Sequence, residues 1–188
     1  MLTIAWDVDD VLNDLTRLWF EKEWLLSHPG CKAGFAELKQ NPPHQILGVT
    51  LEEYLSSLDA FRLSVNYERL EPLKEAVEWF NEYGGNFRHI ALTAVPLTAA
   101  PRSASWVLAH FGKWIRTFHF IPSARSAEGL VEYDRDKGAY LGWLKKADIL
   151  VEDKEENIRS AAKAGVRGIL IPRPWNNARG SFTEALKI

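Results

Sequence analysis

Short runs of apolar residues recur along the chain at intervals typical of buried strands. Five of them stand out, at residues 2–6, 89–92, 118–121, 148–151 and 168–171. Each run is brief and nearly continuous in apolar residues, rather than alternating with polar ones. This pattern indicates strands that are covered on both faces.

Helical patterns separate most of these runs. Leu73, Val77 and Phe80 fall on one face of a helix predicted before the second strand, and a glycine pair ends it. Similar patterns ending in glycine occupy residues 103–112 and 155–165. Strands that alternate with helices predict an α/β fold, with a Rossmann-like parallel sheet and helices on both faces.

The stretch from residue 15 to 68 interrupts this alternation of strands and helices. It contains helical patterns at residues 15–26 and 51–61, and no run in it predicts a strand. We therefore predict a small helical cap at residues 15–68, inserted after the first strand. The α/β core domain then comprises residues 1–14 and 69–188.

Composition narrows the classes of partner. The chain has 188 residues, a formal net charge of −2 and no basic run, so polymeric nucleic acid is not an expected partner. No apolar stretch approaches the ~18 residues of a membrane span, and no targeting segment is predicted. The single cysteine, Cys31, excludes an internal disulfide and favours a cytoplasmic location. The oligomeric state stays open, a homodimer included.

Carboxylates gather directly after the first apolar run, where Asp7, Asp9 and Asp10 fall within four positions. Two such charges ~5 Å apart repel by about 3 kcal/mol at an effective dielectric constant of 20. Asp7 and Asp9 are two residues apart, so on an extended strand end they point the same way. Ligands of open parallel sheets bind beyond these strand ends, which suggests a reason for the cluster.

Polar residues also accompany the later strands. Thr93 and Ala94 follow the second strand, and Glu152 and Asp153 follow the fourth. Lys137 precedes the fourth strand, with Arg135 nearby. The sequence thus places an acid pair, a threonine, a lysine and a second acid pair at one edge of the sheet.

This set suggests phosphate chemistry with a metal ion. Carboxylate oxygens suit Mg²⁺ rather than zinc. One carboxylate of the first pair can attack phosphorus while the other moves a proton, and the lysine and threonine can hold phosphate oxygens. Acids after a strand also cap helices or line solvated turns. The order of the residues along successive strand ends favours the functional interpretation.

Four stretches resemble the motifs of the haloacid dehalogenase (HAD) superfamily of phosphatases. They are "AWDVDDV", "HIALTA", the lysine of "DRDK" and "ILVEDKEEN". Three further stretches, "RDK", "SWVLAHFG" and "IPRPWN", resemble the 5'(3')-deoxyribonucleotidase-like group of that superfamily. The resemblance implies the HAD fold with a helical cap after the first motif.

The resemblance also implies roles for the acids. Asp7 would be the nucleophile and a ligand of Mg²⁺. Asp9 would be the general acid and base, and its backbone carbonyl would bind the metal. Asp153 would be a further metal ligand, with Glu152 acting indirectly or through water.

The same resemblance implies how the phosphate is held. Thr93 and the amide of Ala94 would bind it, and Lys137 would neutralise it and orient the nucleophile. Arg102 stands beside Ser103, where the nucleotidase-like group has a lysine, and is a predicted substrate-binding residue.

Two more residues are predicted to bind substrate. They are Arg135, next to the lysine motif, and Trp19, in the first helix of the cap. Trp19 either packs inside the cap or stacks on a flat ring above the phosphate. The sequence departs from the nucleotidase pattern at Asp10, Ser103 and Glu152.

The sequence therefore predicts a Mg²⁺-dependent phosphomonoester hydrolase that works through an aspartyl-phosphate. Its expected substrate is a small soluble phosphate, with a (deoxy)nucleoside monophosphate as one candidate. Two alternatives stay open. One is a module on the HAD fold that binds a phosphate ligand without catalysis, and the other is a phospho-receiver signalling domain.

Overall fold

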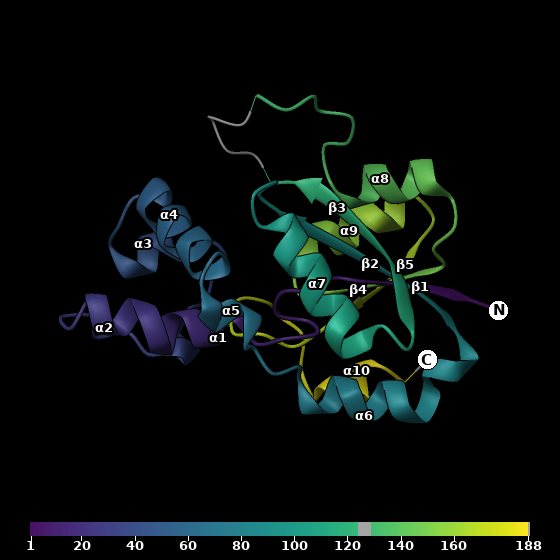
Figure 1. The fold of residues 1–188 in the computed structure, drawn as a ribbon, viewed down its shortest axis with the longest axis horizontal. Coiled ribbons are helices and arrows are strands. Elements are labelled where there is room, and N and C mark those ends of the chain that lie inside the picture. Colours follow the sequence, from purple (N-terminus) through teal and green to yellow (C-terminus); the bar gives the residue numbers. More distant parts are fainter. Residues whose placement is uncertain (124–128, 188) are drawn as a thin grey trace.

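Five parallel strands form the centre of the fold, in the order β3-β2-β1-β4-β5 (Figure 1). The computed structural model describes residues 1–123 and 129–187. The strands are β1 (Thr3–Trp6), β2 (Arg88–Val95), β3 (Ile115–Pro122), β4 (Ile149–Glu152) and β5 (Arg167–Leu170). Each of the five overlaps one of the predicted apolar runs. The first strand of the chain is the central one, paired with β2 and β4.

Helices cover both faces of the sheet, so the predicted α/β fold with a parallel sheet is confirmed (Figure 1). Ile4 and Trp6 of β1 belong to the core cluster that also includes Phe80, whereas Ala5 between them packs in a second cluster with Leu141. Successive side chains of a strand point to opposite faces, which explains this division. The helices around the sheet are α6 (Lys74–Tyr83), η3 (Gly84–Asn86), α7 (Ala100–Phe111), α8 (Lys137–Leu144), α9 (Glu155–Lys163) and α10 (Phe182–Ala185).

Residues 15–68 form a helical insertion between β1 and β2, and it lies to one side of the sheet (Figure 1). Its helices are α1 (Leu15–Trp19), η1 (Phe20–Trp24), α2 (Leu25–Ser27), η2 (Phe35–Glu37), α3 (His44–Leu47), α4 (Leu51–Arg62) and α5 (Val65–Glu68). The rings of Trp19 and Trp24 lie 5.3 Å apart, and Tyr54 meets Trp19 edge-on. Aromatic packing thus holds the insertion together. Its definition as a separate cap domain stays a prediction.

Helix α8 was not predicted from the sequence, although its first residue is Lys137. Asp136 caps the helix, because its carboxylate accepts a hydrogen bond from the amide of Ala139 at 2.9 Å. Gly138 is buried against α9, and a Cβ at this position would lie 2.4 Å from the backbone carbon of Ser160. The close approach of the two helices fixes the position of Lys137 at the edge of the sheet.

Gly138→Ala is expected to lower the free energy of unfolding by about 2–3 kcal/mol, because the backbone of α9 must move to admit the methyl group. Gly142→Ala in the same helix is the matched control, since its Cβ would meet only Ala164 at 3.6 Å. For the control we expect no loss, or a gain of up to about 1 kcal/mol from helix propensity. Urea denaturation measures both. Equal stability of the two variants would contradict the close approach.

In residues 1–123 and 129–187, no helix is both long and apolar enough to cross a membrane.

Candidate active site

The predicted site residues meet at the carboxyl end of the sheet. Asp7 follows the central strand β1, Thr93 lies near the end of β2, and Glu152 ends β4 with Asp153 next to it. All four side chains are buried. Because β2 and β4 flank β1, their ends converge on Asp7, at the position where parallel sheets bind ligands.

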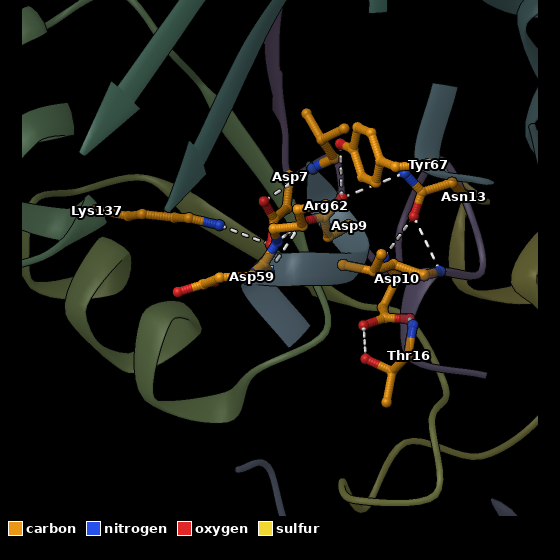
Figure 2. Close-up of polar contacts among 11 residues, drawn as sticks. Asp7, Asp9, Asp10, Asn13, Thr16, Asp59, Arg62, Tyr67 and Lys137 are labelled. Carbon is orange, nitrogen blue, oxygen red and sulfur yellow. Dashed lines mark hydrogen bonds and ion pairs between the residues drawn. The ribbon is translucent and has the colours of Figure 1, made fainter. Parts of the chain in front are cut away.

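Lys137 lies between two carboxylates at this edge. Its Nζ atom is 2.7 Å from Asp7 Oδ2 and 2.6 Å from Glu152 Oε2. The lysine is only 2% exposed. Burial alone lowers the pKa of Lys137, and the two carboxylates more than offset this, so the pKa lies above its ordinary value. Lys137 is therefore a fixed cation directed at Asp7 (Figure 2).

The acids of this edge can hold a metal ion. Oxygen atoms of Asp7, Glu152 and Asp153 lie within 4.8 Å of one another. Glu152 is already engaged, because Oε2 pairs with Lys137 and Oε1 accepts hydrogen bonds from the amides of Asp153 and Lys154. Asp7 is engaged as well, since its Oδ2 pairs with Lys137 and its Oδ1 accepts a hydrogen bond from a backbone amide at 2.8 Å. Together the three carboxylates form an all-oxygen donor set, which suits Mg²⁺.

The acids carry more negative charge than Lys137 can balance. Burial raises the pKa of Asp7 to about 7, and repulsion from Glu152 adds to this against the attraction of Lys137. Burial also raises the pKa of Glu152 and of Asp153. A divalent cation would remove this cost, so the residues fit the predicted metal.

We expect the metal-free protein to lose stability as the pH rises. The pKa of Asp7 rises from 3.8 to about 7 on folding, so between these values the folded protein binds more protons than the unfolded chain. From about pH 5 to about pH 8 the loss should be roughly 2 kcal/mol for this group.

Urea titrations in chelator at both pH values measure this loss. Asp7→Asn should weaken the dependence by about this amount, because it removes one of the titrating groups. Adding Mg²⁺ should restore the stability of the wild type at the higher pH. Metal-free stability that rises over this range would contradict the excess of buried negative charge.

Asp9 does not join the acidic cluster around Lys137. Its Oδ2 atom accepts hydrogen bonds from Nε and Nη2 of Arg62, both at 3.1 Å. Its Oδ1 atom accepts from the hydroxyl of Tyr67 at 3.2 Å and from Asn13 at 3.3 Å. Figure 2 shows the carboxylate held between these side chains. The helical insertion, which supplies Arg62 and Tyr67, therefore orients the second acid of the first motif.

Asp10 shapes the turn after the first strand. Its φ of 63° lies in the left-handed region, which favours glycine and tolerates aspartate better than most residues. Its carboxylate accepts hydrogen bonds from the amide and the hydroxyl of Thr16. Arg173 donates from Nε to its backbone carbonyl at 2.7 Å. Asp10 thus fixes the loop that carries Asp7, and the geometry explains why a glycine-like position is occupied by aspartate.

A cavity of about 180 Å³ opens at this edge. The described residues that line it come from both parts of the chain: Asp7, Asp9, Asp10, Thr16, Asn41, Pro42, Tyr54, Leu55, Leu58, Arg62, Thr93, Ala94, Ser123, Lys137, Asp153, Lys154 and Asn157. The predicted phosphate-binding residues Thr93, Ala94 and Lys137 are among them.

Three predicted substrate-binding residues do not line this cavity. Arg102 forms an ion pair with Glu68 at 2.7 Å, on the side of α7 that faces the insertion. Arg135 is exposed, before α8. Trp19 is fully buried inside the insertion, and its Nε1 donates to Ser57 at 3.0 Å. Of the two alternatives predicted for Trp19, the structure shows packing inside the insertion.

The sequence did not reveal several contacts of the site. Arg62 was missed, although Asp59 three residues earlier gave a weak helical charge pattern. Trp175 belongs to the "IPRPWN" stretch, and its Nε1 donates to Oδ2 of Asp153 at 2.8 Å, a contact that the stretch alone did not indicate. Asn157, four residues after Asp153, lines the cavity and was given no role.

No protein-family model matches the chain, and no curated protein sequence matches it significantly. Solved structures do share its fold. A haloacid dehalogenase-like family hydrolase from Streptococcus pneumoniae is 10% identical, with a TM-score of 0.61 over 92% of this chain and 85% of that one. A HAD hydrolase of family IA, variant 3, from Entamoeba histolytica is 15% identical, with a TM-score of 0.53 over 98% and 95%.

Protein Tyrosine Kinase A from Mycobacterium tuberculosis is also similar. It is 16% identical, with a TM-score of 0.60 over 95% of this chain and 86% of that one. The chain therefore has the fold of HAD-like hydrolases, as the resemblance implied. Because the same fold carries a protein named as a kinase, the reaction must be argued from the site.

Proposed function

We propose that the protein is a Mg²⁺-dependent phosphomonoester hydrolase that uses Asp7 as its nucleophile. The observation that carries the proposal is the buried arrangement of Asp7, Lys137 and Glu152, with Asp153 beside it and Thr93 on the neighbouring strand. Such a site offers an attacking carboxylate, a fixed cation and oxygen ligands for a metal ion. It lies in a cavity that residues of the helical insertion help to line.

The residues divide the reaction into two steps. In the first, an oxygen of Asp7 attacks phosphorus, the bond from phosphorus to the leaving oxygen breaks, and Asp9 gives that oxygen a proton. In the second, Asp9 takes a proton from water, whose oxygen attacks the aspartyl-phosphate and releases inorganic phosphate and the Asp7 carboxylate.

Other residues hold the phosphoryl group and the metal. Lys137, Thr93 and the amide of Ala94 would bind phosphoryl oxygens and stabilise the charge that develops on them. Asp7 and Asp153 would hold Mg²⁺, with the backbone carbonyl of Asp9. When bound, Mg²⁺ offsets the repulsion among the carboxylates and polarises the phosphoryl oxygens.

The test is phosphate release from acetyl phosphate and from a panel of phosphomonoesters, with Mg²⁺ and with chelator. We expect release only with Mg²⁺. Asp153→Asn should raise the Mg²⁺ concentration for half-maximal rate by about tenfold or more, because it removes a charged ligand. Asp134→Asn, outside the cavity, is the matched control and should leave that concentration unchanged.

Other outcomes would select an alternative. Phosphate release that is insensitive to chelator would contradict the requirement for a metal ion. Stable phosphorylation by acetyl phosphate without turnover would favour a receiver-like signalling domain. Binding of phosphate compounds with no release from any of them would favour a non-catalytic module. The nucleotidase-like resemblance makes nucleoside monophosphates one candidate substrate class, and the panel includes them.

A further inference from the structure

The cavity is small for a substrate that contains a nucleobase. Its volume of about 180 Å³ lies below the roughly 300–1,000 Å³ of pockets that enclose drug-sized ligands. Part of this space belongs to the phosphate group, next to Asp7, Thr93 and Lys137. On the basis of the proposed function, we propose that the substrate is the phosphomonoester of a short, uncharged polyol, and not of a nucleoside.

The aromatic residues of the insertion do not offer a stacking surface to the cavity. Trp19 and Trp24 are at most 1% exposed and pack against each other. One face of Trp24 is also covered by the ring of His28, at 3.7 Å. Tyr54 lines the cavity, but it is 2% exposed and its ring meets Trp19 edge-on. These rings are buried in the core of the insertion, so none of them offers a free face on which a nucleobase could stack.

Two of the described basic residues that line the cavity are held by protein carboxylates. Arg62 uses Nε and Nη2 for Asp9 and Nη1 for Asp59. Lys137 is held by Asp7 and Glu152. A second anionic group on the leaving group would therefore compete with buried ion pairs.

Acids also outnumber bases among the described lining residues. Asp7, Asp9, Asp10 and Asp153 stand against Arg62, Lys137 and Lys154. With Mg²⁺ and the phosphate dianion both bound, the formal charge of this set stays negative, which disfavours a carboxylate on the leaving group.

The rest of the lining suits carbon atoms that carry hydroxyl groups. Asn41 from the insertion and Asn157 from α9 bring amide groups that can both donate and accept hydrogen bonds. Leu55 and Leu58 of α4 supply an apolar wall. A short polyol presents both kinds of surface without a charge.

The experiment compares kcat/KM for phosphomonoesters under one Mg²⁺ concentration. Glycerol phosphate and phosphoglycerate have the same carbon skeleton and differ by a carboxylate, so this pair isolates charge. The comparison of glycerol phosphate with thymidine monophosphate tests the effect of the size of the leaving group. We expect glycerol phosphate to exceed each of the others by about tenfold or more.

Each result has a defined meaning. A preference for thymidine monophosphate would contradict the proposed limit on the size of the leaving group. A preference for phosphoglycerate would contradict the proposal that the leaving group is uncharged. Acetyl phosphate separates this inference from the proposed function, because its turnover requires only the phosphoryl site. Turnover of acetyl phosphate without the glycerol phosphate preference defeats the inference alone, and no turnover of any compound defeats both.

Cavity-wall variants provide a second measurement. Leu58→Ala should raise the ratio of kcat/KM for thymidine monophosphate to that for glycerol phosphate by about tenfold. The shorter side chain enlarges the cavity on the side of the insertion. Leu55→Ala, at a half-buried position of the same wall, gives the same test should Leu58→Ala fail to fold. Leu51→Ala, on the same helix but 44% exposed, is the control and should leave the ratio unchanged. An unchanged ratio in both wall variants would contradict the proposal.

Discussion

Replacing Asp7 with asparagine is expected to lower the rate of phosphate release by roughly 10⁴-fold or more, while the protein stays folded. The amide has no anionic oxygen that can attack phosphorus. Stability should be unchanged or higher in the metal-free protein, because burial and the charge of Glu152 already disfavour the ionised form of Asp7. A loss of activity without a loss of stability separates a nucleophile from a structural acid.

Two measurements check this expectation. Phosphate release from acetyl phosphate gives the rate, and the intact mass after an acid quench reports the covalent intermediate. The wild type should gain the mass of one phosphoryl group, and Asp7→Asn should not. Asp134→Asn should behave as the wild type. Full activity of Asp7→Asn would exclude the covalent mechanism.

Much of the site follows from local sequence. Five short apolar runs became five parallel strands, because strands buried on both faces leave this signature. Once the strands are placed, the acids after β1 and β4 and Thr93 in β2 must meet at one sheet edge. The meeting of Asp7 with Glu152 was therefore predictable although 145 positions separate them.

The partners of Asp9 show where such reasoning ends. Arg62 and Tyr67 are 53 and 58 positions away and come from the helical insertion. Their contacts depend on how that insertion packs against the sheet, and this packing is set by many apolar contacts that no short pattern encodes. Trp19 illustrates the same limit, because a buried ring and a ring poised over a ligand have the same local sequence pattern.

Lys137→Met is expected to have the second large effect. It should remove nearly all phosphate release and lower the free energy of unfolding by roughly 3 kcal/mol or more near neutral pH. The methionine has a similar shape, but it leaves the carboxylates of Asp7 and Glu152 buried without their shared cation. Urea denaturation in chelator measures the loss of stability, and phosphate release from acetyl phosphate measures the loss of activity.

The double variant Lys137→Met/Glu152→Gln separates the two roles of the lysine. Glu152 is fully buried, and its Oε2 lies 2.6 Å from Nζ of Lys137, so neutralising both partners removes one of the two unpaired carboxylates and leaves that of Asp7. We expect the double variant to recover part of the lost stability, because one uncompensated buried carboxylate costs less than two. Activity should stay low, since the phosphoryl group still lacks its fixed cation. Recovery of activity together with stability would show that Lys137 acts by holding the fold rather than by binding phosphate.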